Sequence, residues 1–203
     1  MQPVSCGAVL YGAELLRTTV TMNEEQILRG ALTEVMQYLQ KQLRERLEKQ
    51  GHRLTGKAIR TMEFTVDVKN GIGVGEIEME FYTQFLERGV SRDRIPFSGR
   101  SGRGGVSKYI QALADFFRKR GVPEREVLRA AFATAHKHKR EGMPTRASGR
   151  FSRDNGNART GFITRTMEES QGAIITILGN KVEQTILVRI EQAFTGAEGL
   201  ISI

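Results

Sequence analysis

Apolar residues recur at steps of three and four positions between Asn23 and Gln50, which is the spacing of one face of an α-helix. Asn23 is a good helix cap and Gly51 a good terminator, so the pattern predicts a long amphipathic helix over residues 23–50. Residues 1–22 are expected to be an N-terminal arm, or an extension upstream of the natural start. The apolar positions of the helix are Ile27, Leu28, Ala31, Leu32, Val35, Met36, Leu39, Leu43 and Leu47.

Strict alternation of apolar and polar residues follows, first over Met62–Val68 and again over Glu76–Phe81. Two alternating runs joined by residues that tolerate positive φ predict an antiparallel β-hairpin, and the glycine-rich segment Gly71–Gly75 is expected at its tip. The second run places three acidic residues on one face of its strand: Glu76, Glu78 and Glu80. They are either a solvated face or a surface that meets a basic region of a neighbouring subunit.

The second half of the chain alternates helical patterns with glycine- and arginine-rich loops. Four helices are expected, over residues 82–89, 107–120, 123–141 and 162–194, with Gly179-Asn180 as a possible break in the last. Together with the hairpin they predict an α+β fold in four segments: an arm (1–22), a helix and hairpin core (23–89), an inserted basic loop and helical hairpin (90–161), and a C-terminal helix that completes the core (162–203). The loop 142–161 is expected to be ordered only against a partner.

Charge is strongly segregated along this chain. Residues 88–165 contain 19 Lys and Arg against 6 Asp and Glu, whereas the remaining residues carry 12 basic and 17 acidic side chains. Such a basic region repels itself unless something acidic lies beside it, either a nucleic acid or the acidic face of another subunit. A plain solubility surface is the third possibility. The candidate contacts are Arg92, Arg94, Arg100, Arg103, Lys137, Lys139, Arg140, Arg146, Arg150 and Arg153.

No catalytic pattern accompanies this charge. His136 and His138 are two residues apart on a predicted helix, whereas helical metal pairs need a spacing of four. The glycine-rich segments 71–75 and 99–105 lack the spacing of dinucleotide and phosphate-binding loops. The single Cys6 excludes an internal disulfide, and no apolar run reaches the length of a membrane span. No enzyme activity, cofactor, metal or membrane contact is therefore expected.

Three short motifs occur in a definite order. The segment His52–Arg60 contains Thr55-Gly56 before the hairpin, and Tyr82, Glu87 and Gly89 follow the hairpin in the pattern Tyr-x-x-x-x-Glu-x-Gly. The segments Gly142–Arg146 and Gly161–Ile163 then precede the last helix. In this order the chain resembles the neck and tail-completion proteins of long-tailed bacteriophages, with an inserted segment Val90–Glu141.

That resemblance implies a non-enzymatic virion protein: a homo-oligomeric ring that joins portal and tail around the DNA channel. Its implied partners are the portal and adjacent neck or tail proteins, with non-specific contact to packaged DNA, and its location is the virion. The alternative interpretation is a free nucleic-acid-binding protein that contacts phosphates independently of sequence. A small enzyme such as a nuclease is a third hypothesis, although clustered acidic metal ligands are missing from the sequence.

Overall fold

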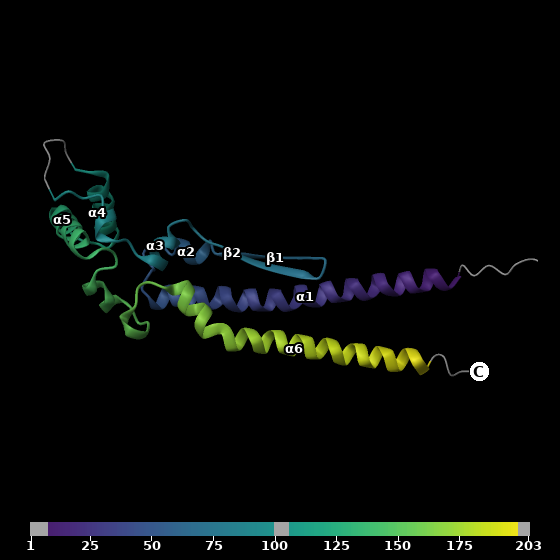
Figure 1. Ribbon diagram of the computed structural model, residues 1–203. Helices are drawn as coiled ribbons and strands as arrows, with labels where there is room; N and C mark the ends of the chain where they lie inside the picture. Colours follow the sequence, from purple (N-terminus) through teal and green to yellow (C-terminus); the bar gives the residue numbers. More distant parts are fainter. Residues whose placement is uncertain (1–7, 100–105, 199–203) are drawn as a thin grey trace, which may run out of the picture. The chain divides into compact units, whose positions relative to one another are not determined.

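The computed structural model describes residues 8–99 and 106–198, and it confirms the predicted α+β class (Figure 1). Two long helices and a two-stranded antiparallel sheet are joined by shorter helices. Their bounds are α1 Ala8–Lys49, α2 Lys57–Arg60, β1 Glu63–Lys69, β2 Ile72–Glu78, α3 Thr83–Arg88, η1 Arg92–Arg94, α4 Lys108–Lys119, α5 Glu124–Glu141, η2 Arg146–Phe151, η3 Asn155–Asn157 and α6 Phe162–Glu198.

Contacts within the chain divide it into two compact units. Unit 1 comprises residues 1–40, 63–78 and 169–203, and unit 2 comprises residues 41–62 and 79–168. The division passes through both long helices. Unit 1 holds the hairpin and most of α1 and α6, whereas unit 2 holds all the shorter helices.

Both long helices differ from their predicted bounds. α1 begins at Ala8, so the helix includes residues 8–22, and Asn23 lies inside the helix instead of capping it. Residues 1–7 lie outside the described part of the chain. Likewise, α6 continues through Gly179-Asn180 without a break. Extending an existing helix costs little per residue, and one interior glycine costs only about 1 kcal/mol relative to alanine.

The hairpin turns at two residues, Asn70 and Gly71, whose φ angles of 53° and 75° suit a type I′ turn. Lys69 pairs with Ile72 across this turn, so β2 begins immediately after Gly71. The expectation of a glycine-rich tip over residues 71–75 was therefore wrong, because Gly73 and Gly75 lie within the strand. Glu80 and Phe81, expected in the second strand, lie beyond its end at Glu78.

The glycines inside β2 allow the hairpin to pack closely on α1. Gly73 and Gly75 pair with Val68 and Val66, on the sheet face turned to the helix. A Cβ atom added at Gly73 would lie 2.2 Å from Leu32 Cδ1, and one at Gly75 would lie 2.6 Å from Met36 Sδ. The strand backbone thus occupies the space that a side chain would otherwise need. The core of unit 1 contains Val35, Met36, Leu39, Tyr38, Phe64, Val66, Ile77, Ile174, Ile177 and Leu178.

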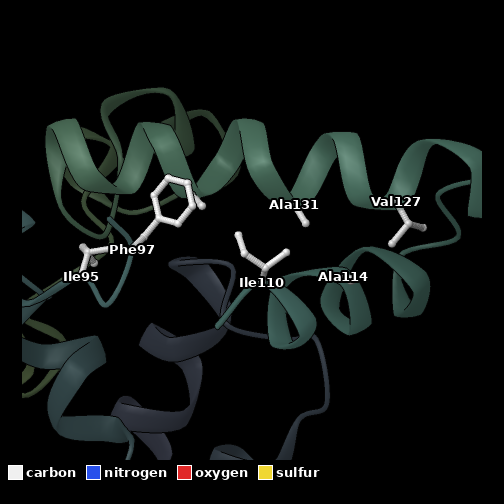
Figure 2. Packing of buried hydrophobic residues seen from close by; sticks show 7 residues of the cluster. Ile95, Phe97, Ile110, Ala114, Val127 and Ala131 are labelled. Atoms are coloured by element: carbon white, nitrogen blue, oxygen red, sulfur yellow. The ribbon is translucent and has the colours of Figure 1, made fainter. Parts of the chain in front are cut away.

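Unit 2 has its main core between α4 and α5. Ser107 caps α4 as predicted, since its side chain accepts a hydrogen bond from the Ile110 N–H. Figure 2 shows Ile110 and Ala114 of α4 facing Ala131 and Val127 of α5. Alanines let the two helices approach closely, and Phe97 from the preceding loop closes one end of the cluster. The buried residues are Ile95, Phe97, Ile110, Ala114, Val127, Ala131 and Ala135.

We expect Gly75→Ala to destabilise the protein by about 1–3 kcal/mol, because the new methyl group would overlap the buried Met36 side chain. Gly30→Ala is the matched control. It makes the same change inside α1, at a position with no atom within 4 Å of the added Cβ, and should stabilise the helix by about 0.5–1 kcal/mol. Urea denaturation of both variants measures the difference. Equal stability of the two would contradict the close packing of β2 on α1.

Candidate functional site

The motif residues of the sequence meet one another in unit 2. Gly56 directly precedes α2 and has a φ of 63°. In the same turn the Lys57 N–H donates a hydrogen bond of 3.4 Å to Thr55 Oγ1. The backbone N–H of Ala58 lies in the first turn of α2, where N–H groups lack a partner within the helix. It donates to the Tyr82 hydroxyl oxygen at 2.9 Å. The turn before the hairpin is therefore tied to the segment that follows it. Tyr82 itself is 37% exposed, so its ring is not part of the core.

Glu87 caps the last helix from a distant part of the chain. Its carboxylate accepts hydrogen bonds from the backbone N–H groups of Ile163 (2.7 Å) and Thr164 (3.2 Å), and from the Thr164 hydroxyl (2.6 Å). Its own carbonyl accepts from the Gly161 N–H. A carboxylate at this position satisfies N–H groups that have no partner within the helix and suits the positive end of the helix dipole.

The inserted helical hairpin leaves and re-enters the fold at one point. Val90 and Met143 form an isolated antiparallel bridge with two hydrogen bonds, Val90 N–H to Met143 O (2.7 Å) and Met143 N–H to Val90 O (2.8 Å). Gly89 directly before it has a φ of 71°, and a Cβ there would lie 2.5 Å from Met143 O. Residues 91–142 thus form an excursion whose two ends are adjacent.

The predicted basic contacts fall into two groups. Arg92 and Arg94 are exposed on η1, which packs on α5, the helix that carries Lys137, Lys139 and Arg140. Lys139 Nζ lies 3.4 Å from Ile95 O and joins these two elements. The second group lies on η2 and just after it: Arg146, Arg150 and Arg153 are all exposed. Arg100 and Arg103 lie outside the described residues.

The loop 142–161 folds against its own chain, contrary to the expectation that it needs a partner. Asp154 is 8% exposed and lies 3.5 Å from Arg46 Nη1, and it accepts a hydrogen bond from Gln50 Nε2 at 2.9 Å. The same Gln50 amide reaches the Thr160 carbonyl. The Arg153 N–H donates to Lys49 O. The end of α1 therefore holds the loop through a buried carboxylate.

Two arginines lie near the exposed Phe151 ring: Arg150 of this loop and Arg120 at the end of α4. The guanidinium carbons of Arg150 and Arg120 lie 4.8 and 5.7 Å from the centre of the Phe151 ring, and Arg120 also lies 4.8 Å from that of Phe116. Burial, and then the charge of Arg120, lower the pKa of Arg159. We call Arg120, Arg150 and Arg159 the arginine triad. The sequence pattern indicated only Arg150, because nothing in sequence spacing brings Arg120 and Arg159 beside it.

A histidine lies against the same loop. His52 Nε2 is 3.2 Å from the Arg159 carbonyl oxygen, which can only accept, so the Nε2–H donates. Burial, followed by the positive charge of Arg159, lowers the pKa of His52 from its ordinary 6.5 to about 4. His52 is therefore neutral near pH 7 and packs as a polar but uncharged group.

The other two histidines belong to the helical hairpin. His138 Nδ1 lies 2.7 Å from the Tyr109 hydroxyl, and burial lowers the pKa of His138. It therefore adds no charge to the basic end of α5 near pH 7. His136 packs edge-on against Phe97. Within the described residues no group of three or more His, Cys, Asp and Glu side chains could hold a metal ion.

Unit 1 presents two further surfaces. Glu76 and Glu78 lie on the outer face of the sheet, beside Glu63 and Thr65 of β1, and both are exposed. Glu80 does not share this face. It lies in unit 2, where an ion pair with Lys57 Nζ at 2.8 Å lowers its pKa. The predicted acidic face therefore keeps two of its three members.

An apolar face also lies open along α6. Ile175 is 69% exposed and Val182 is 58% exposed, although the neighbouring Ile174, Ile177 and Leu178 pack toward α1. The exposed positions recur at helical spacing, so they form one continuous stripe. We call it the α6 stripe: Ile175, Gly179, Val182, Ile186 and Ile190.

Comparison with protein-family models, with curated proteins and with solved structures finds no match to this chain. Across the part of the chain that the structure describes, no helix combines the length and apolar character that crossing a membrane requires.

Replacing Asp154 by Ala should cost about 3 kcal/mol of stability, because it removes a buried carboxylate from the side chains of Arg46 and Gln50. Asp93→Ala is the control, since the Asp93 side chain is 84% exposed and pairs with the adjacent Arg92; little change is expected there. Chemical denaturation measures both. A loss for Asp154→Ala no greater than for the control would show that the loop does not depend on this ion pair.

Stability should fall as the pH is lowered from 6.5 to 4. The folded state keeps His52 neutral down to about pH 4, whereas the unfolded chain binds a proton near pH 6.5. The contribution of neutral His52 to the free energy of unfolding is thus fully present above pH 6.5. It is lost toward pH 4, at up to about 1.4 kcal/mol per pH unit. His52→Gln keeps a donor for the Arg159 carbonyl but cannot titrate. The difference in unfolding free energy between wild type and variant should therefore shrink or reverse on acidification, and parallel curves would refute the assignment.

Proposed function

We propose that this chain is a structural subunit of a tailed-bacteriophage virion, a ring-forming neck protein that joins portal and tail around the DNA channel. It acts by assembly and not by catalysis. The exact neck layer, whether head–tail connector or tail completion, is left to the experiment below.

The observation that carries the proposal is that the motif segments contact one another. These are the segments on which the resemblance to phage neck proteins is based. The Thr55-Gly56 turn contacts Tyr82 through the Ala58 N–H, and Glu87 contacts the segment Gly161–Ile163. The remaining motif residue, Gly89, lies at the Val90–Met143 bridge. These contacts support the proposal because they join the motif segments into one core across 24 residues (Ala58 to Tyr82) and 76 residues (Glu87 to Ile163) of sequence.

The inserted helical hairpin can be accommodated without changing the core that the motif segments form. Its ends are adjacent at the Val90–Met143 bridge, and it buries a cluster of its own between α4 and α5. A segment with this geometry can be added to a fold without disturbing the elements on either side. The departure from the family pattern is thus an added module, to which we assign contacts with adjacent rings or with DNA.

The surfaces left open in each unit also support a subunit role. A row of exposed apolar side chains at helical spacing is unusual in a monomer and typical of a surface that another chain covers. In unit 1 the α6 stripe is such a row, and the sheet carries the acidic pair Glu76 and Glu78. In unit 2 basic residues outnumber acidic residues among the exposed charged side chains. Opposite charges on different faces suit heterologous contacts between copies, which close into rings.

The decisive experiment is cryo-electron microscopy of intact particles of the phage that encodes this chain. We expect a symmetric ring between portal and tail, with density for the long helices α1 and α6. Absence of the chain from the particle would refute the neck assignment. A free protein that binds nucleic acid through the same basic residues would then be the interpretation to pursue.

A pair of variants tests whether the α6 stripe is a contact surface. Val182→Glu places a charge within the stripe, whereas Gln184→Glu places the same charge at an exposed position on the opposite side of the helix. Both variants should fold, as judged by circular dichroism. Particle yield should fall strongly only for Val182→Glu, because a buried unpaired carboxylate is costly at an interface. Normal particles from Val182→Glu would exclude the stripe from assembly contacts.

A further inference from the structure

The arginine triad is a concentration of positive charge without acidic neighbours. Among the described residues, Arg120, Arg150 and Arg159 form no ion pair with any carboxylate. The contrast with Arg118 is direct, since it lies only two residues before Arg120. Arg118 pairs with both Glu124 (2.7 Å) and Asp115 (2.8 Å). What sets the triad apart from the other unpaired basic residues is that Arg120 and Arg150 both lie near the Phe151 ring.

The guanidinium groups of the triad are held in place before any ligand arrives. Arg150 and Arg120 lie over aromatic rings, and such contacts stabilise a cation while leaving the N–H edges of its guanidinium group available. Arg159 is anchored by His52, which donates to its carbonyl, and by the Ser148 carbonyl 3.4 Å from its Nη1. The buried Asp154 fixes the loop that carries Arg150 and Arg159.

Arg159 also has a hydrogen-bonding group that is not satisfied within the chain. Its Nε atom is buried and has no hydrogen-bond partner. A buried N–H without a partner costs free energy, as does the mutual repulsion of Arg159 and Arg120. An oxyanion bound at the triad would relieve the repulsion and would accept hydrogen bonds from the guanidinium groups.

We propose that the arginine triad, Arg120, Arg150 and Arg159, binds phosphate groups. Phosphate fits better than a single carboxylate because it offers more oxygen acceptors and more charge to several planar guanidinium groups. Two sources share this chemistry, the backbone of a nucleic acid and free inorganic phosphate. The site does not depend on the neck assignment, because its residues and contacts all lie within unit 2 of one chain.

The first arm of the test uses a fluorescein-labelled oligothymidylate and fluorescence anisotropy over a range of NaCl concentrations. Full-length wild type should bind, and the triple variant Arg120→Gln/Arg150→Gln/Arg159→Gln should bind at least about tenfold more weakly. Each lost phosphate contact should lower the slope of log affinity against log salt by about 0.7, so the triple variant should lose about 2.

The matched control is Arg118→Gln, which removes the same charge two residues from Arg120. It should keep the wild-type slope, because Glu124 and Asp115 already neutralise Arg118, whereas Arg120→Gln alone should reduce affinity and slope. Arg120 is exposed, so this variant should remain folded even if Arg159→Gln destabilises the loop. Equal effects of Arg118→Gln and Arg120→Gln would overturn the proposal in favour of a diffuse basic surface.

The second arm distinguishes the source of the phosphate. Inorganic phosphate, compared with chloride at equal ionic strength, should raise the thermal midpoint of wild type and of Arg118→Gln more than that of the triple variant. Stabilisation without oligonucleotide binding assigns the site to free phosphate, and triad-dependent oligonucleotide binding assigns it to a nucleic-acid backbone. If the triple variant equals wild type in both arms, the triad is not a phosphate site.

Discussion

The buried carboxylate of Asp154 is the interaction on which the functional half of unit 2 depends. Placing Arg46 and Asp154 out of water is costly, and hydrogen bonds from the Gln50 amide and the Asn155 N–H to the carboxylate offset part of that cost. That arrangement fixes a loop rich in glycine, serine and asparagine, whose composition alone would leave it disordered. The positions of Phe151, Arg150 and Arg159 all follow from it.

Unit 2 combines two levels of organisation. The motif contacts of Tyr82 and Glu87 join turns and helix ends that are distant in sequence, and each satisfies backbone N–H groups at a helix start. The inserted hairpin is joined to the rest of unit 2 at the Val90–Met143 bridge and through Arg120, which lies near the Phe151 ring. It also has an apolar core of its own. An excursion that buries its own apolar residues is free to present its charged surface to a partner, because its stability does not require that surface.

The two units solve the packing problem by different means. In unit 1 the absence of side chains at Gly73 and Gly75 lets the sheet lie against α1, so a hairpin too small to be stable alone gains an apolar partner. In unit 2 alanines let α4 and α5 approach each other. Each unit also has exposed charged or apolar side chains that its own core does not use. These side chains form the Glu76 and Glu78 surface, the α6 stripe and the basic surface of unit 2.

Local patterns of the sequence determined the element types: helical periodicity for α1, α4, α5 and α6, alternation for the hairpin, and Ser107 and Gly89 as helix boundaries. These succeed because each depends on neighbouring residues. Tertiary structure decided the rest, since a one-dimensional pattern contains no information about which distant segments meet. In the structure Gly73 and Gly75 lie in the strand and not at the expected hairpin tip, and Glu80 does not share the face of Glu76. The loop 142–161 is held by contacts of Asp154 with Arg46 and Gln50. Tertiary structure also assembled Arg120, Arg150 and Arg159, because a long-range ion pair and not sequence spacing brings them together.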